Sequence, residues 1–307
     1  MRSAIVTGGQ GFIGRYLVKA LQRNGVNVKT LGRRKSAETT HFVLDKPSWD
    51  SPALDRVLVD TASDCIFHLA GATRGTSSEL THINVGLTQS LLRALRRTGL
   101  QPLLVVAGSA AEYGSAIIDG EPICETATCA PLSAYGVSKQ AQTRDALAYA
   151  DATGNPVLVA RIFNPLGRGM PSHLAIGDFA RQIASMPRSR GTLLVGNIDV
   201  RRDMIDVEHI AALLCRLAEN PNARGVVNVC SGQAPLLRDL VELLIARCGR
   251  KINIEVDVSR VRTNELHAVI GSTDLLTKLG CSPPSTDFPA VIARVWQGME
   301  ERMACVS

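Results

Sequence analysis

The sequence predicts an α/β protein, built as a Rossmann-like, doubly wound parallel sheet with a smaller C-terminal α/β region. Three observations lead to this fold class. Short apolar runs alternate with amphipathic helical patterns, a glycine-rich turn follows the first run, and from residue 164 onward prolines and glycines interrupt the alternation. Strands that alternate with helices in this way assemble into parallel sheets from βαβ units.

The expected strands and helices follow one another along the first half of the chain. The strands are residues 4–7, 26–31, 42–44, 65–69, 103–107 and 157–163. The helices between them include residues 12–22, 80–97 and 134–150. Six strands are enough for a sheet with helices on both faces.

A later helix and strand indicate that the chain returns to this sheet after leaving it. They span residues 207–217 and 226–230. We therefore expect a Rossmann domain of residues 1–163 plus about 203–231, and a second domain of about 164–202 plus 232–307. Domains of this size can each bury a core of their own.

The composition narrows the class of protein. The chain has 307 residues, 45% of them apolar and 20% charged, as is typical of a compact globular protein. Its net charge of +6 comes from dispersed basic residues and is accompanied by only 4% aromatic residues, which disfavours nucleic acid as a partner. The excess of positive charge suits ligands that carry phosphates, although it can also serve solubility alone.

Neither a membrane nor a metal is expected as a partner. We see no uninterrupted apolar stretch long enough to cross a bilayer and no secretory signal. The eight cysteines are scattered without a Cys-x-x-Cys pair, and the six histidines lack ligand spacing. We expect a cytoplasmic protein with reduced thiols and no metal site.

The glycine-rich turn lies between the first expected strand and the first expected helix. It reads Thr7-Gly8-Gly9-Gln10-Gly11-Phe12-Ile13-Gly14. Glycines let a pyrophosphate approach the backbone, and the N–H groups at the helix start stabilise its charge. We expect Gly8, Gly11, Phe12, Ile13 and Gly14 to bind a dinucleotide, and at this point both a flavin and NAD(P) fit.

The end of the second strand favours NADP(H). NAD-binding domains usually carry an acidic residue there, which holds the ribose 2′-hydroxyl. Here the sequence is Leu31-Gly32-Arg33-Arg34, and two guanidinium groups attract a 2′-phosphate. NAD(H) stays possible, since the arginines can instead be a solvated basic loop. Asp45 is either an adenine contact or a turn residue.

Three residues have the pattern of a catalytic group. Tyr135 and Lys139 are four residues apart at the start of an expected helix and therefore share one face. A nearby ammonium lowers the pKa of a phenol, so we expect Lys139 to prepare Tyr135 for acid–base chemistry on an alcohol or ketone. Ser109 ends the strand 103–107, at the sheet edge where ligands bind, and can hydrogen-bond the substrate oxygen.

Together these residues resemble the extended short-chain dehydrogenases/reductases of the NAD(P)-dependent epimerase/dehydratase family. The resemblance includes the Gly8/Gly11/Gly14 loop, His68-Leu69-Ala70-Gly71, Asn84, Ser109 before Tyr113-Gly114, and Tyr135/Lys139. It implies an NAD(P)-dependent oxidoreductase in which Ser109, Tyr135 and Lys139 are catalytic. Leu69, Ala70, Gly71, Ile162, Tyr135 and Lys139 then contribute to cofactor binding, and the helices 84–97 and 134–150 form a homodimer.

The second half of the chain is similar to one branch of that family, the GDP-4-keto-6-deoxymannose reductases and GDP-mannose dehydratases of deoxysugar biosynthesis. The similar segments are residues 161–167, 178–183, 195–198, 202–203 and 228–232. By this resemblance Asn164, Arg202 and Arg262 bind the nucleotide diphosphate of a GDP-sugar. The second domain is then the region that binds the sugar nucleotide.

Within this branch, the residues favour a 4-keto reductase. A 4,6-dehydratase of the family carries a carboxylate at the position of Ala111, and Glu112 is one residue later, which in an extended segment points a side chain to the opposite side. Reduction of a nucleotide-activated 4-keto-6-deoxy sugar by NADPH needs only Ser109, Tyr135 and Lys139. A 4-epimerase uses the same residues and stays an alternative, as do a dehydratase and a cofactor-binding regulatory protein without chemistry.

Overall fold

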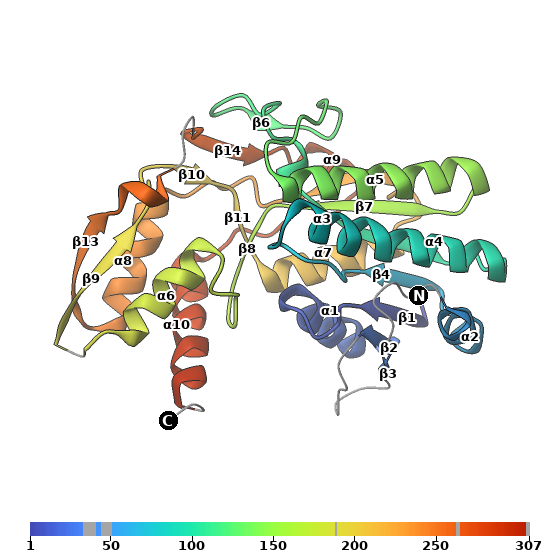
Figure 1. Cartoon of the computed structure of the whole chain (residues 1–307), viewed down its shortest axis with the longest axis horizontal. Coiled ribbons are helices and arrows are strands. Elements are labelled where there is room, and N and C mark those ends of the chain that lie inside the picture. Colours follow the sequence, from blue (N-terminus) through green and yellow to red (C-terminus); the bar gives the residue numbers. More distant parts are fainter. Residues whose placement is uncertain (33–40, 44–50, 188, 262–264, 305–307) are drawn as a thin grey trace.

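The computed structural model describes residues 1–32, 41–43, 51–187, 189–261 and 265–304. Its central feature is a sheet of seven parallel strands in the order β12-β7-β5-β4-β1-β2-β3 (Figure 1). These strands are β1 Ser3–Thr7, β2 Asn27–Gly32, β3 His41–Val43, β4 Cys65–His68, β5 Leu103–Ser109, β7 Val157–Ile162 and β12 Gly225–Val229. The predicted fold class is confirmed, and the returning strand β12 pairs with β7 as the seventh strand.

Helices cover both faces of this sheet, because successive strand residues point to opposite sides. Ala4 and Val6 pack into one core with α1 (Phe12–Arg23) and α7 (Val207–Glu219). Ile5 packs into the other core, with α2 (Pro52–Thr61), α4 (Gly86–Thr98) and α5 (Ala134–Thr153). The sheet is therefore buried on both sides, as an all-parallel sheet requires.

The segment that was expected to be one helix over residues 80–97 is more complex. It begins with α3 (Ser77–Leu80), which starts at a capping box formed by Thr76 and Glu79. A π-helical turn, Thr81–Val85, then leads into α4. Wider turns of this kind are rare and often occur at functional sites. Sequence periodicity does not reveal this turn, because the apolar spacing continues through it.

A second apolar core lies in the other part of the molecule (Figure 1). It is formed mainly by α6 (Ala175–Ser185), α8 (Leu237–Cys248), α10 (Phe288–Ala304) and the parallel pair β9 (Arg190–Val195) and β13 (Lys251–Val256). The short α9 (Asp274–Lys278) instead packs on the core of the main sheet through Leu276. The division into two domains at the stated boundaries stays a prediction.

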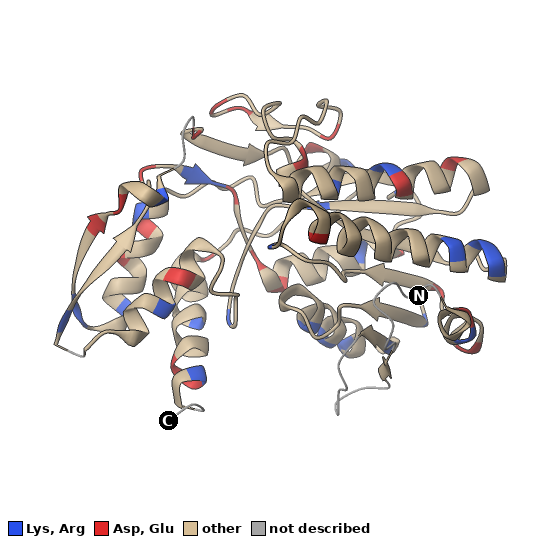
Figure 2. Ribbon diagram, viewed as in Figure 1, with Lys and Arg blue, Asp and Glu red and all other residues tan. Residues whose placement is uncertain are grey.

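Two small sheets connect these parts. One pairs β8 (Asn164–Leu166) with β11 (Met204–Asp206). The other places β14 (Ala268–Gly271) between β10 (Arg201–Arg202) and β6 (Pro122–Ile123). Lys and Arg residues are distributed over both parts of the ribbon (Figure 2). Among the described helices, none is long and apolar enough to span a membrane.

Candidate active site

The glycine loop packs against the end of β4. Gly8 has a positive φ of 69°, and a Cβ atom on it would lie 2.8 Å from the backbone nitrogen of Ala70 and 2.8 Å from the carbonyl carbon of Leu69. A side chain there would force the two segments apart. The structure therefore brings together the loop and the Leu69–Ala70 segment, two groups of residues predicted to bind the cofactor.

The same loop ends at the start of α1. Gly11 is the N-cap, and its N–H donates to the Gly8 carbonyl oxygen over 2.9 Å. A Cβ on Gly14 would clash with that carbonyl oxygen, so this position also requires glycine. Since the N-cap has no side chain, the helix N-terminus is open to a ligand. Backbone N–H groups in this arrangement suit a pyrophosphate.

Ser109 stands at the carboxyl end of β5, beside the end of β7. Ser109 pairs in the sheet with Ile162, which is also a predicted site residue. The Ser109 hydroxyl accepts a hydrogen bond from the Ala111 N–H (3.2 Å) and caps a short turn, η2 (Ala110–Glu112). This edge is where doubly wound sheets bind their ligands.

Tyr135 lies in the first turn of α5, next to Ser109. The helix begins there because the Ser133 hydroxyl caps the Gly136 N–H at 3.0 Å. Burial raises the pKa of the Tyr135 hydroxyl, a hydrogen bond with Ser109 opposes that rise, and the charge of Glu112 adds to it. Ser109 and Tyr135 are thus neighbours, as predicted, and the tyrosine is held as a neutral phenol.

Lys139 lies one turn further along α5 and is buried. Its ammonium donates to the Ala107 carbonyl oxygen and to Oε1 of Gln142. Burial lowers the pKa of Lys139 to about 8, against an opposing effect of Glu112. The lowering of the Tyr135 pKa by Lys139 stays a prediction. The ammonium is directed to Ala107 and Gln142, and burial is the largest influence on the phenol.

A buried hydrogen-bond chain continues from Lys139 toward β1. Gln142 donates to the Thr88 hydroxyl at 2.8 Å, and Thr88 contacts the imidazole of His68 at 3.0 Å. His68 in turn contacts the Thr7 hydroxyl at 2.9 Å. Burial lowers the pKa of His68 to about 3, so its ring is neutral. The histidine is a structural residue, as expected, and links the lysine to the base of the glycine loop.

Asn84, in the π-helical turn, connects the loop after β4 to α5. Its side chain exchanges two hydrogen bonds with the backbone of Ala72, at 2.8 and 2.9 Å, and donates to the Ser138 hydroxyl at 2.9 Å. A Cβ on Gly71 would lie 2.8 Å from the Asn84 amide oxygen. Gly71 is therefore needed for this contact, and Asn84 holds the loop that was predicted to bind the cofactor.

Two of the residues predicted to bind substrate lie next to Asp203, Asn164 through a hydrogen bond and Arg202 as its neighbour in the chain. The side-chain amide of Asn164 donates to the Asp203 carbonyl oxygen at 2.8 Å. Arg202 pairs with Glu265 at 2.9 Å and donates to the carbonyl of Leu266 at 3.0 Å. Contact of Asn164 and Arg202 with a diphosphate stays a prediction.

Four predicted site residues lie outside the described residues: Arg33, Arg34, Asp45 and Arg262.

Two further predicted site residues, Phe12 and Ile13, lie in the first turn of α1. Phe12 packs against the second apolar core, and Ile13 packs against the core of the main sheet. Among the described residues, no cluster of histidine, cysteine or carboxylate side chains could hold a metal ion.

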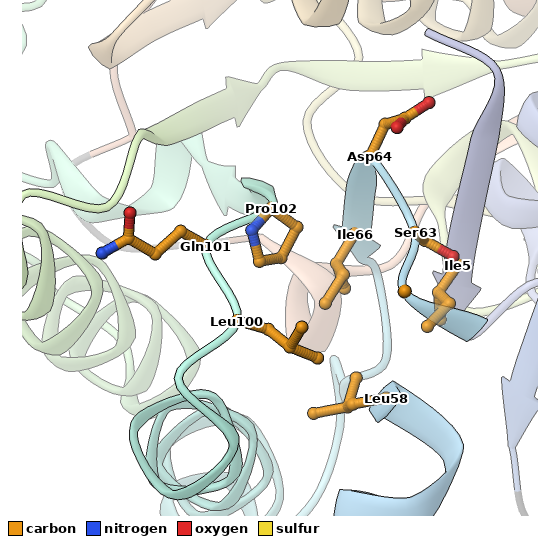
Figure 3. Close-up of a pocket in the computed structure, with 9 residues that line it drawn as sticks. Ile5, Leu58, Ser63, Asp64, Ile66, Leu100, Gln101 and Pro102 are labelled. Carbon is orange, nitrogen blue, oxygen red and sulfur yellow. The ribbon is translucent and has the colours of Figure 1, made fainter. Parts of the chain in front are cut away.

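A cavity of about 390 Å³ lies at the opposite, amino-terminal edge of the sheet (Figure 3). Its lining includes Leu58, Ile66 and Leu100, with Asp64 at its border. The Asp64 carboxylate already accepts hydrogen bonds from the N–H groups of Arg2 and Ser3. Since no predicted site residue lines this cavity, we assign the chemistry to the carboxyl edge.

Two residues that support the site are not among those predicted from the sequence. Gln142, which holds Lys139, has the spacing of a lysine contact on a helix, three residues on, and could have been found from that spacing. Arg161 pairs with Glu112 beneath Ser109 at 3.1 Å. Nothing in the sequence indicates this pair, because it joins residues far apart in the chain.

Fold and site together define a nicotinamide-dependent enzyme of the short-chain dehydrogenase type, and the comparison with known families agrees. Residues 4–230 match the NAD dependent epimerase/dehydratase family, and the chain belongs to that family. The extended short-chain dehydrogenase resemblance seen in the sequence is thereby confirmed.

Within this family, the chain is similar to proteins with assigned activities on deoxysugar nucleotides. A GDP-6-deoxy-D-mannose reductase of Pseudomonas aeruginosa is 34% identical over 278 residues, which is 87% of each chain. A dTDP-6-deoxy-L-talose 4-dehydrogenase (NAD(P)(+)) of Kitasatospora kifunensis is 33% identical and covers 80% of this chain and 78% of its own. The solved structure of RMD from Pseudomonas aeruginosa complexed with NADPH matches with a TM-score of 0.82 and 30% identity, over 98% of this chain and 100% of that one.

Proposed function

We propose that this enzyme reduces the 4-keto group of a nucleotide-activated 4-keto-6-deoxy sugar, of the GDP-4-keto-6-deoxymannose kind, with NADPH. The observation that carries the proposal is the meeting of Ser109 and Tyr135 at the carboxyl edge of the sheet, with Lys139 one turn away. The reductase and 4-dehydrogenase relatives support it, because both are named for chemistry at a deoxysugar nucleotide.

The described residues fit a dinucleotide. Gly8 and Gly14 allow the close backbone contacts that shape this loop, because a side chain at either position would collide with protein. The loop leads directly into the N-terminus of α1, whose N–H groups suit a pyrophosphate. When bound, the reduced nicotinamide supplies the hydride. NADP(H) is favoured by Arg33 and Arg34 in the sequence and by the NADPH held in the related RMD structure, while NAD(H) stays possible.

The chain's own residues then control the proton and the substrate carbonyl. Ser109 hydrogen-bonds the C4 oxygen and fixes its direction. Tyr135 donates its proton to that oxygen as the alkoxide forms. Tyr135 is protonated at neutral pH, as a proton donor must be before the step. Lys139 is protonated at neutral pH, and we assign it to the nicotinamide ribose and to restoring the tyrosine proton.

The position of Glu112 separates reduction from dehydration. A dehydratase needs a carboxylate beside the sugar, yet the Glu112 side chain is fully buried and accepts hydrogen bonds from Ser109 N–H and Arg161. Ala111 supplies no acid or base. The geometry therefore supports a reductase over a 4,6-dehydratase. A 4-epimerase, which needs the same residues as a reductase, is the second candidate.

The experiment that tests this proposal follows NADPH absorbance with a panel of keto-sugar nucleotides and identifies the products. We expect stoichiometric NADPH oxidation with a 4-keto-6-deoxy sugar nucleotide and a 6-deoxy sugar as product. Interconversion of 4-hydroxy epimers without net NADPH oxidation would instead identify an epimerase. Cofactor binding without turnover of any sugar nucleotide would identify a regulatory protein.

Two further parts of the proposal concern the whole protein. We infer a homodimer through α4 and α5, and Val137, half exposed at the start of α5, is an apolar side chain available to such an interface. We infer the cytoplasm as its compartment, since Cys65, Cys215, Cys230 and Cys281 are buried free thiols.

A further inference from the structure

We propose that Glu112 and Arg161 form a buried positioning pair that holds Ser109 beside Tyr135. The inference rests on the proposed function, because its consequence is a rate. It gives a role to two residues outside the predicted site, one in the turn after β5 and the other in the neighbouring strand β7. Neither side chain is exposed enough to bind substrate itself: Glu112 is fully buried and the Arg161 side chain is 7% exposed.

Glu112 joins the catalytic serine to the arginine through its two oxygens. Oε1 accepts the Ser109 N–H at 2.7 Å, and Oε2 accepts Nε–H of Arg161 at 3.1 Å. The carboxylate therefore fixes the backbone of Ser109 to a side chain of β7. Charge-assisted hydrogen bonds of this kind are stronger than neutral ones and define direction as well as distance.

The turn that carries Ser109 has little space to move between β7 and α5. A Cβ on Gly108 would lie 2.8 Å from Oε1 of Glu112 and 2.9 Å from Val159. On the other side, a Cβ on Gly136 would clash with the Ala111 carbonyl oxygen. Since Gly136 follows Tyr135 directly, the close contact of turn and helix sets the distance between the serine and the tyrosine.

Arg161 is itself anchored away from the catalytic edge. Its guanidinium carbon lies 4.6 Å from the centre of the Tyr113 ring, and Nη1 donates to the Glu125 carbonyl oxygen at 3.4 Å. Tyr113 then donates to the side-chain oxygen of Asn228 at 2.6 Å. The arginine is thus held by an aromatic face and a backbone oxygen, so it acts on the reaction only through Glu112.

A double-mutant cycle with Ser109 separates positioning from mere stability. Glu112→Gln keeps a hydrogen-bond acceptor but leaves Arg161 without its counter-charge, so we expect the turn to shift. We expect kcat to fall about 10- to 100-fold while KM for NADPH and for the sugar nucleotide changes about twofold or less. In a Ser109→Ala background the same substitution should lose most of its effect on kcat, because positioning acts through the serine. The remaining influence of the Glu112 charge on Tyr135 and Lys139 should appear as a shift of the pH profile.

Tyr113→Phe is the matched control within the same buried network. It removes the hydrogen bonds of the hydroxyl with Asn228 and Arg161 but keeps the ring beside the guanidinium and the contacts of Ser109 and Glu112. We therefore expect lower thermal stability and an unchanged kcat. An equal loss of kcat for Glu112→Gln with and without the Ser109 hydroxyl would overturn the proposal. If Glu112→Gln does not fold, Arg161→Lys, which keeps the charge but not the planar geometry, replaces it in the cycle.

A measurement without turnover distinguishes this inference from the proposed function. Amide hydrogen exchange at Ser109 should accelerate about tenfold or more in Glu112→Ala, with Val105 of the same strand unchanged, because only Ser109 loses its acceptor. Unchanged exchange at Ser109 would contradict the positioning role. If the wild-type protein reduces no keto sugar but this exchange result holds, the proposed function fails and the positioning pair stands.

Discussion

Among single residues, Tyr135 is the one whose environment bears most directly on the proposed chemistry. The spacing of Tyr135 and Lys139 predicted their shared site, but spacing alone could not tell where the ammonium points. In the structure it donates to Ala107 and Gln142, and burial keeps the phenol protonated. A protonated tyrosine is a proton donor, and a donor is what reduction of a ketone requires.

Replacing Tyr135 by Phe tests this role. The ring and its packing remain while the proton donor is lost, so kcat should fall by several orders of magnitude and the Kd for NADPH should change little. Steady-state kinetics and fluorescence titration of NADPH measure the two quantities. Loss of NADPH binding with unchanged kcat would assign Tyr135 to the cofactor instead.

Lys139 predicts a pH dependence of stability. The pKa of Lys139 is about 8 in the folded protein, compared with 10.5 for a lysine in the unfolded chain. Between pH 8 and pH 10.5, the unfolded chain therefore binds a proton at Lys139 that the folded chain does not bind. Burial of the charged Lys139 therefore lowers the stability of the folded protein at pH 8 and below. This loss of stability disappears as the pH rises to 10.5.

The unfolding free energy of the wild-type protein, relative to Lys139→Met, should rise by about 3 kcal/mol from pH 8 to pH 10.5. Urea denaturation at a series of pH values gives this difference. A constant difference between the two proteins would show that the lysine is not held in a desolvated environment.

At the scale of elements, the glycine loop and the serine turn owe their positions to close backbone contacts. The glycine motif predicted the first, because each glycine has a known structural reason in a strand–turn–helix context. The Glu112–Arg161 pair could not be predicted, since its partners meet only through the sheet pairing of β5 and β7. The π-helical turn before α4 could not be predicted either, because the spacing of apolar residues is the same as in an α-helix.

Gly14→Ala tests the loop, because its new Cβ would collide with the Gly8 carbonyl oxygen. We expect NADPH affinity to fall at least about tenfold and stability to fall by about 1–3 kcal/mol, measured by titration and thermal unfolding. The matched control is Gly86→Ala, also in a helix, where the nearest neighbouring atom is 4.0 Å away, on His82. The control should stabilise the protein by up to about 1 kcal/mol. Equal effects of the two substitutions would contradict the account.

At the scale of the whole molecule, the alternation of strands and helices predicted the parallel sheet and the return of the chain as β12. The small sheets that link the two parts were not predictable, since their strands are only two to four residues long. Strands of that length carry no periodic pattern. They form here because residues distant in sequence, such as β6 and β14, are brought side by side.

The proposed dimer is a prediction at this scale. Sedimentation at micromolar concentration should give twice the mass of the chain, and Val137→Glu should shift the protein to a monomer by placing a charge in an apolar interface. Ile118→Glu, at an exposed apolar residue outside α4 and α5, serves as the control and should remain dimeric. A monomeric wild-type protein would contradict the interface.

The central claim is that hydride reaches C4 of a keto sugar while Tyr135 supplies the proton. The most direct measurement uses NADPH in which both hydrogens at C4 of the nicotinamide are deuterium, a 4-keto-6-deoxy sugar nucleotide as substrate, and NMR of the product. We expect one deuterium at C4 of the reduced sugar and one NADPH oxidised per product. A product without deuterium at C4, or turnover without net oxidation of NADPH, would contradict it.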